Sequence, residues 1–315
     1  MNRKFALQMF ATGDNNDQPV RVYTKDFKNL LQAVFKKQSF FADFFGGGIE
    51  ALDGIQHKDT AFSLKTSDIA CVVRTGTVGQ SGTPAYNEGE NIAFGSGTGN
   101  STRFGERTEI IYTDIDVPYT WDWVFHEGID RHTVNNSFEA AIADRLELQA
   151  RGKIGQFNAK HGAFISANAG KTVAGGAAVT AANVADVFNE LHKHFVDIEA
   201  VGTFVAKVTP AVNNAIVDTG LTTSAKGSTV NIDRDTVTMF KGFVIEEIPT
   251  PLFATNTVVY AYIPGVGKAF TGIETARTIE SEDFDGVALQ GAGKAGEYIL
   301  PDNKKAVAKV TVTGA

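Results

Sequence analysis

Three stretches of the chain carry apolar residues at helical spacing, and we expect each to form a helix. The first runs from Thr24 to Phe45 and is ended by the glycines at 46–48. The second runs from Asn136, a residue type that caps helix N-termini, to His161, and would be about 38 Å long. The third, Thr180–Val196, has the most regular apolar stripe: Val184, Val187, Phe188, Leu191 and Phe195.

Two details of these helices bear on packing. The first helix ends in an aromatic group that we expect to pack mostly in a core: Phe40, Phe41, Phe44 and Phe45. The second contains Gly152 and Gly155, which weaken its middle and would permit another backbone to approach closely.

Runs rich in β-branched and aromatic residues predict strands. They are Asp68–Arg74, Glu106–Trp123, Gly202–Val208, Val237–Ile248 and Thr257–Ile263. The first two flank a polar, glycine-rich stretch at 75–104, and together they predict a very long hairpin arm. An isolated two-stranded ribbon is at best marginally stable in water, so we expect this arm to lie on a neighbouring copy. A flexible surface loop is the alternative.

The remaining segments complete the predicted order of elements. Residues 167–178 are small and predict a hinge, and Thr209-Pro210 opens a short helix. Residues 221–231 predict a polar loop. The αβαβ order of 180–263 indicates a compact α/β unit. The strand-like tail, 270–312, could pair beside the second helix and close a discontinuous first domain.

Composition narrows the class of protein. The chain has 315 residues, of which 43% are hydrophobic and 21% charged, and its formal net charge is −7. Its lysines and arginines are scattered, which argues against tight non-specific binding of nucleic acid. Cys71 is the only cysteine, so an intrachain disulfide or a cysteine-based zinc site is excluded. We find no convincing signal peptide and no apolar run of membrane-spanning length.

Glycine-rich motifs do not support nucleotide binding. Residues 291–296 match G-x-G-x-x-G, but a strand-like run that ends in Pro301 follows where a helix is required, so we expect a glycine turn. The Gly-Lys pairs at 170–171 and 267–268 lack the preceding glycine of a phosphate-binding loop.

Clusters of polar residues give no convincing active site. His192 and His194 are two apart on a helix and point to different faces. Asp233 and Asp235 flank an arginine and favour a solvated turn. A last group could do acid–base chemistry but lacks a partner nucleophile: His126, Glu127, Asp130 and His132. We therefore predict no catalytic residue, no cofactor and no metal, and an enzyme is not supported.

The order of these elements carries more information than any motif. A polar arm, a helix, a glycine-rich hairpin, a long helix, a hinge, an α/β unit and return strands follow one another. This order, and the closing stretch ARTIESEDFDGVALQGAGKAGEYILPDNKKAVAKV, resembles the major capsid proteins of tailed bacteriophages, which have the Hong Kong 97-type fold. The resemblance covers nearly the whole chain and implies an α+β fold.

The resemblance also implies a division of the chain. Its parts would be an N-terminal arm (1–23), a helix and connection (24–67), an E-loop hairpin (68–123), a peripheral domain with a long spine helix (124–179), an α/β axial domain (180–263) and return strands that complete the peripheral domain (264–315).

The resemblance further implies contacts between subunits in three regions. In the E-loop these are Gly76, Gly79, Tyr86, Asn91, Phe94, Arg103 and Phe104. In the axial loop they are Leu221, Lys226 and Asn231, and in the arm Phe10, Asp14 and Asp17. Residues 75–104 contain no lysine, so an E-loop lysine cannot cross-link neighbouring subunits.

The implied function is a shell subunit. The chain would assemble into hexamers and pentamers around double-stranded DNA, in a virion built in the bacterial cytoplasm. Its partners would be a separate scaffolding protein, a portal protein and, in some phages, a decoration protein, with no membrane and no sequence-specific DNA contact. The alternatives are an encapsulin-type nanocompartment, a surface-binding protein with a glycine-rich loop, and a cytoplasmic enzyme of unrecognised type.

Overall fold

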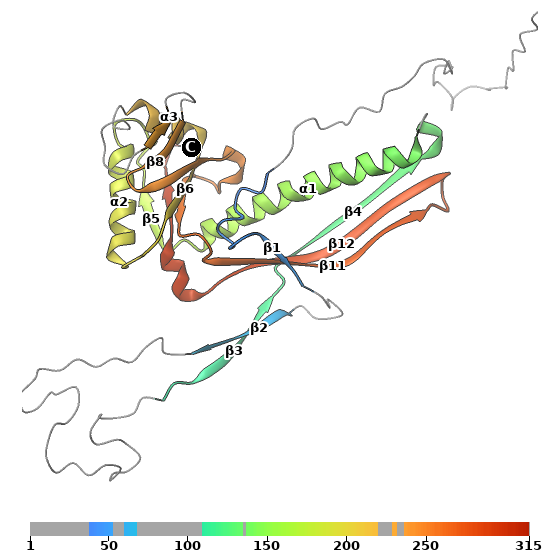
Figure 1. Ribbon diagram of the computed structural model, residues 1–315, viewed down its shortest axis with the longest axis horizontal. Coiled ribbons are helices and arrows are strands. Elements are labelled where there is room, and N and C mark those ends of the chain that lie inside the picture. Colours follow the sequence, from blue (N-terminus) through green and yellow to red (C-terminus); the bar gives the residue numbers. More distant parts are fainter. Residues whose placement is uncertain are drawn as a thin grey trace, which may run out of the picture.

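The computed structural model describes residues 38–52, 60–67, 109–134, 137–219, 229–231 and 236–314. The N-terminal arm, residues 24–37 of the first predicted helix, the strand at 68–74 and the stretch 75–104 therefore lie outside the described residues. Figure 1 shows a compact unit beside a long, thin body, with a two-stranded ribbon projecting from their junction.

The long body consists of helix α1 (Phe138–Ala167) beside a four-stranded sheet. Ser137 caps α1, because its hydroxyl accepts a hydrogen bond from the backbone N–H of Ala140. The sheet order is β1-β11-β12-β4. Its strands are β1 (Ile49–Ala51), β11 (Gly267–Glu280), β12 (Gly286–Ile299) and β4 (Trp121–Asp130).

The compact unit is a seven-stranded sheet in the order β5-β13-β10-β6-β9-β8-β7. Its strands are β5 (Lys171–Ala174), β13 (Val307–Thr311), β10 (Thr257–Tyr262), β6 (Phe204–Val208), β9 (Phe243–Glu247), β8 (Thr236–Phe240) and β7 (Thr229–Asn231). Helices α2 (Val184–Asp197) and α3 (Pro210–Asp218) pack on it. The short 3-10 helices are η1 (Arg131–Thr133), η3 (Thr250–Leu252) and η4 (Pro301–Ala306).

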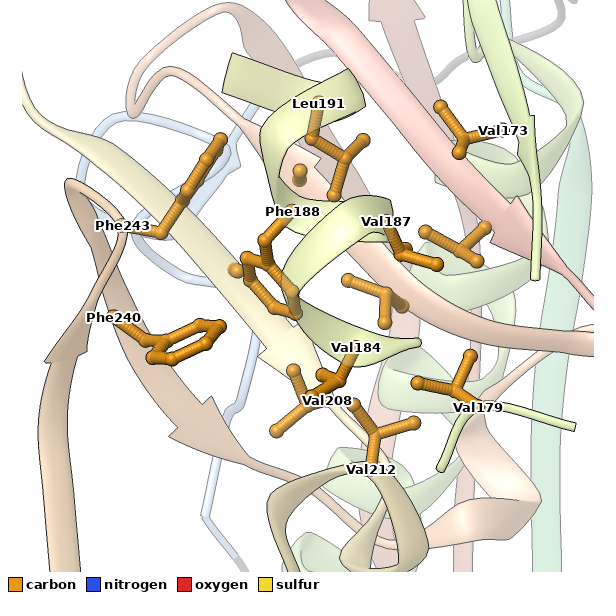
Figure 2. Packing of buried hydrophobic residues seen from close by; sticks show 14 of the residues in the cluster. Val173, Val179, Val184, Val187, Phe188, Leu191, Val208, Val212, Phe240 and Phe243 are labelled. Atoms are coloured by element: carbon orange, nitrogen blue, oxygen red, sulfur yellow. The ribbon is translucent and has the colours of Figure 1, made fainter. Parts of the chain in front are cut away.

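The predicted apolar stripe of α2 is confirmed as the centre of the main core (Figure 2). All five of its residues are buried, and the ring of Phe188 meets those of Phe240 and Phe243 edge-on at 5.2 and 5.6 Å. Thr209 caps α3, with Pro210 in its first turn, as predicted. The α/β unit therefore forms because one side of each helix is apolar and covers the sheet.

A second core joins the compact unit to the long body. It gathers Phe41, Phe44 and Phe45 against Tyr260 and Tyr262. This confirms that the aromatic group at 40–45 packs in a core. The segment itself differs from prediction, because residues 40–46 form turns rather than a helix. Gly46, Gly47 and Gly48 follow with positive φ angles and redirect the chain into β1.

The ribbon pairs β2 (Thr60–Ser67) with β3 (Tyr112–Pro118) in antiparallel register. The single strand predicted at 106–123 is wrong. The segment contains β3 and the first residues of β4, which belong to two different sheets. Pairing with β2 stops at Pro118, and the backbone N–H of Thr120 bonds to the carbonyl of Ala295 in the four-stranded sheet. Proline supplies no N–H to a ladder, so it marks the point of departure.

Two segments predicted as irregular are strands. Within 167–178, predicted as a hinge, β5 runs parallel to β13 and buries Val173. The small residues permit tight packing, since a Cβ added at Gly175 would lie 2.8 Å from Val179 Cγ2. The end of the predicted loop at 221–231 is β7, which pairs with β8, and 220–228 lie outside the described residues.

The single strand predicted at 237–248 is two strands. β8 and β9 form a hairpin through Lys241 and Gly242, whose φ angles are 50° and 88°. Positive φ at both turn residues is typical of a tight two-residue hairpin turn. Apolar residues on both sides of the turn hid it in the sequence.

The return strands contribute to both sheets. β11 and β12 pair with each other and β12 with β4 beside α1, as expected. β13 differs, because it joins the seven-stranded sheet between β10 and β5. Its residues Val307, Ala308 and Val310 are fully buried; Ala308 and Val310 belong to the main core and Val307 to the second core.

α1 is also longer than predicted, ending at Ala167 rather than His161. All of its buried residues lie from Phe157 onward. The close backbone approach expected near Gly152 occurs at Gly162 instead, where an added Cβ would lie 2.1 Å from the carbonyl oxygen of Leu252. A Cβ at Gly152 would meet nothing within 4 Å. Among the helices that the structure describes, none is long and apolar enough to span a membrane.

Candidate assembly surfaces

The ribbon has one largely exposed strand, β3. Along β3, Val117 is buried but most other residues are exposed. Tyr112, the first residue of β3, is 68% exposed, and Ile110 and Ile111, which precede it, are 44% and 53% exposed. A run of large apolar side chains at the exposed end of a ribbon is typical of a protein–protein contact.

The base of the ribbon is fixed by aromatic rings. Phe62 of β2 meets Phe270 of β11 edge-on at 5.2 Å and Tyr298 of β12 at 6.4 Å. Tyr119 meets the same Phe270 at 5.6 Å. Desolvation raises the pKa of the Tyr119 phenol. These contacts set the direction in which the ribbon leaves the sheet.

A groove of about 690 Å³ lies between the N-terminal half of α1 and β4. Trp121, Trp123 and Phe125 contribute to its lining from the strand, with Leu146 from the helix. Lys153 lies over the indole of Trp123, with Nζ 3.5 Å from the ring centroid. Burial lowers the pKa of Lys153. The groove explains why α1 buries residues only in its C-terminal half.

An ion pair bridges this groove. Arg145 of α1 donates to both carboxylate oxygens of Glu127 in β4, with 2.5 Å from Nε to Oε2 and 3.1 Å from Nη2 to Oε1. The hydrogen bond to Arg145 lowers the pKa of Glu127. A bidentate pair fixes orientation as well as distance, so it sets the spacing between helix and sheet.

Glycines make room for the aromatic side chains of β4. Gly291 and Gly293 of β12 pair with Phe125 and Trp123 across the sheet. An added Cβ at Gly291 would lie 2.3 Å from the ring of Phe125. The glycines at 291–296 are therefore part of a strand on which rings lie, and the predicted glycine turn is wrong.

His161 and Glu297 form a buried polar pair at the junction of α1 and β12. His161 Nε2 lies 3.6 Å from Glu297 Oε1, and the two residues are 1% and 7% exposed. Among the residues that the structure describes, neither ring nitrogen of His161 has a hydrogen-bond partner. Desolvation lowers the pKa of His161 to about 4 and raises that of Glu297. Trp121 Nε1 donates to Glu297 at 3.1 Å.

Asn158 ties the segment at 38–48 to α1. Its Nδ2 donates to the carbonyl of Gln38 at 2.7 Å, and its Oδ1 accepts from the backbone N–H of Phe40 at 3.1 Å. Asn158 is 3% exposed. The entry of the chain into the body is therefore held by two hydrogen bonds away from water.

Comparison with known proteins rests on structure. No family model and no curated protein matches the sequence. The asymmetric unit of the bacteriophage PhiM1 mature capsid matches at a TM-score of 0.62 and 14% identity, covering 93% of each chain. A chain of Mycobacterium phage Che8 matches at 0.59 and 17%, covering 96% of this chain and 100% of that one. The capsid of cyanophage P-SCSP1u matches at 0.59 and 11%, covering 93% and 94%.

This chain has the Hong Kong 97-type capsid fold of tailed bacteriophages. The resemblance inferred from the sequence is thereby confirmed at the level of the fold, and so is its mixed α and β character. Identities of 11–17% show the fold alone.

Most site residues predicted from the Hong Kong 97-type resemblance lie outside the described residues. This holds for those of the arm, for those of the E-loop, and for Leu221 and Lys226. Asn231 ends β7, where it pairs with Thr236. Of the ribbon, β3 lies within the range 68–123 expected for the E-loop, whereas β2 precedes that range; α1 overlaps the long helix expected at 136–161.

The polar residues considered for catalysis form hydrogen bonds within and between elements of the fold. The Gln290 amide donates from Nε2 to His126 Nε2 and accepts at Oε1 from Arg277, so that the three side chains cross β4, β12 and β11. Asp130 accepts from the backbone N–H of His132 at the start of η1. His194 Nε2 lies 2.9 Å from the carbonyl of Lys305. The sequence missed His161 and Glu297, because nothing local marks two residues that meet across a fold.

Proposed function

We propose that this chain is a major capsid protein that self-assembles into the icosahedral shell around the double-stranded DNA of a tailed bacteriophage. One observation carries the proposal. The fold agrees with that of a mature capsid subunit over 93% of both chains, so the similarity is not limited to a shared core. A shell subunit needs an extended shape with several surfaces for its neighbours, and the described ribbon and long body supply them.

The exposed ribbon supports the same proposal on physical grounds. A two-stranded ribbon has little apolar surface to bury within its own chain, and Ile111 and Tyr112 are more than half exposed. Packing on a neighbouring subunit would bury them. In rings of six and five, the proposed E-loop contacts are those at 76–104, and the axial loop at 221–231 would surround the ring axis. The arm, with Phe10, Asp14 and Asp17, would reach an adjacent subunit.

The other partners follow from the same proposal. A separate scaffolding protein would guide assembly in the bacterial cytoplasm, a portal protein would occupy one vertex, and a decoration protein could bind outside. The subunit would act by structure rather than by catalysis, and the virion would be its final location.

Electron microscopy of the purified chain tests the proposal. We expect closed shells, and we expect particles from a phage lysate to contain this chain together with nuclease-protected double-stranded DNA. A matched variant lacking Gly79–Gly99 should stay soluble and form no shells. Shells that hold protein cargo and no DNA would favour the nanocompartment. A wild-type chain that stays monomeric at high concentration, both alone and with the scaffolding protein, would contradict both.

A further inference from the structure

The cluster of Lys207, Asp43, Glu246 and Tyr262 has the composition and geometry of a site for covalent cross-linking. We propose that Lys207 and Asp43 of the same chain join in an isopeptide bond, with Glu246 as the group that transfers the proton. This is a modification site within one subunit, and it does not depend on the proposed function.

Lys207 is placed unusually for a lysine. It lies in β6 and is 2% exposed, although lysine is almost never fully buried without a partner. Its Nζ lies 3.3 Å from Asp43 Oδ2 and also donates a hydrogen bond to Glu246. Glu246 is its direct neighbour in the parallel register of β6 and β9. The amine is therefore held between two carboxyl groups, one from a distant segment and one from the adjacent strand.

Tyr262 completes the site from β10. Its hydroxyl donates to Asp43 Oδ1 and Oδ2, at 3.1 Å each. The Tyr262 side chain is fully buried, and desolvation holds the pKa of its phenol well above the usual value, so it remains a donor. A donor directed at both carboxyl oxygens is placed to stabilise the negative charge that develops there when an amine attacks the carbon.

The turn that carries Asp43 is held on both sides. The backbone carbonyl of Asp43 accepts from the N–H of Gly265 at 2.9 Å and of Gly46 at 3.3 Å. The next residue, Phe44, packs edge-on against Tyr262 with ring centroids 4.9 Å apart. For well-oriented groups, such fixed proximity gives effective molarities on the order of 10⁵ M or more. This offsets the unfavourable equilibrium of amide formation in water.

The reaction balances without a co-reactant. Glu246 accepts a proton from the Lys207 ammonium, which leaves a neutral amine, and the Asp43 carboxylate takes up that proton. The Nζ lone pair attacks Cγ of Asp43 to form the C–N bond. The C–O bond then breaks, and the hydroxyl leaves as water with the second Nζ proton, returned through Glu246. One ammonium and one carboxylate become one amide and one water.

Intact-mass measurement of the purified, denatured full-length chain tests the proposal. The expected mass is that of the sequence less one water, and fragmentation of a protease digest should show a branched peptide that joins residues 43 and 207. A wild-type chain with the full mass of its sequence overturns the proposal, whatever the variants do.

Three variants show whether a mass lower by one water comes from this bond or from another dehydration of the chain. Lys207→Arg and Asp43→Ala should have the full mass of their sequences, and Glu246→Gln should be largely unmodified while its circular dichroism matches that of the wild type. Lys309→Arg is the matched control, because Lys309 is a partly buried lysine that donates to the Ser166 carbonyl instead, and it should still lose one water. A loss that persists in Lys207→Arg overturns the proposal, since it would then arise elsewhere, for example by cyclisation at Asp285-Gly286.

Discussion

Gly293 of β12 lies directly under Trp123 of β4, so that an added Cβ would come within 2.6 Å of the indole Cζ2. The same Cβ would lie 2.4 Å from the carbonyl oxygen of Gly272 in β11. An indole can shift, but a backbone carbonyl in the middle of a sheet cannot do so without disturbing its hydrogen bonds. The position therefore requires glycine for its lack of a side chain.

We expect Gly293→Ala to lower the free energy of unfolding by about 1–3 kcal/mol, the usual effect of overpacking. Gly152→Ala is the matched control, because a Cβ there meets nothing within 4 Å. In a helix that change should stabilise by roughly 0.5–1 kcal/mol. Denaturant unfolding of both variants measures the difference. Equal effects of the two substitutions on the free energy of unfolding would contradict the requirement for glycine at position 293.

Asn158→Ala should loosen the segment at 38–48. The change leaves the Gln38 carbonyl and the Phe40 N–H without their partners, which we expect to cost about 1–3 kcal/mol. Limited proteolysis should then cleave the segment faster than in the wild type. Asn303→Ala serves as control, since the bond from Asn303 Nδ2 to the Val266 carbonyl is a long one, 3.4 Å. Unchanged cleavage in Asn158→Ala would refute this role.

Stability should depend on pH through His161. Its folded-state pKa of about 4 lies below the ordinary value of 6.5, so the unfolded chain binds more protons between those values. Stability is therefore present above pH 6.5 and is lost as the pH falls toward 4, by about 3 kcal/mol at most. Glu297 acts in the opposite sense, because its raised pKa makes stability fall as the pH rises.

Two variants separate these contributions. His161→Phe should flatten the loss of thermal stability between pH 6.5 and 4. Glu297→Gln should keep the hydrogen bond from Trp121, remove the buried charge, and stabilise the chain most near neutral pH. The melting temperatures of the wild type and both variants are measured as a function of pH. If all three change in parallel across this range, neither group titrates as described.

Phe62→Ala should impair assembly more than folding. The substitution removes the ring that meets Phe270 and Tyr298, and with it the fixed direction of the ribbon. We expect a small change in melting temperature and a several-fold lower yield of shells in electron micrographs. Lys65→Ala, on the same strand but with its side chain 75% exposed, should assemble normally. Normal shell yields from Phe62→Ala would mean that the ribbon base does not direct assembly.

The proposed shell should hold together without covalent bonds between subunits. Residues 75–104 contain no lysine, and arginine does not act as a nucleophile because its guanidinium stays protonated. Particles boiled in detergent should therefore run as one band near 33.7 kDa. An intrachain bond at Lys207 would leave that band in place. A ladder of multimers that survives reductant would show that a lysine elsewhere reaches a neighbour.

The sequence predicted best those helices that bury one apolar face against a sheet. The α2 stripe from Val184 to Phe195 was predicted residue by residue, because a helix packed on a sheet needs apolar side chains every three or four positions. The beginning of α1 differed by one residue in its cap, since Ser137 and Asn136 are both good capping residues. Boundaries of this kind depend on backbone geometry that composition does not specify.

Contacts between distant segments could not be predicted. The G-x-G-x-x-G spacing at 291–296 gave no sign that Phe125 and Trp123 would lie on it. Nor does the sequence around Lys207 show that Asp43 arrives beside it, since that depends on how the turn at 40–46 meets β6. The order of elements predicted the fold, whereas these sites depend on the pairing of strands and turns far apart in the chain.

The position of β13 also constrains when a subunit can finish folding. β13 is made long after β5, yet it lies between β5 and β10, and in the described sheet β5 has no other strand beside it. Until Val307–Thr311 is synthesised, the face of the sheet under α2 is incomplete. A growing chain therefore cannot complete this core before residues 307–311 have been made. Contacts between subunits that need the complete core would form only after that point.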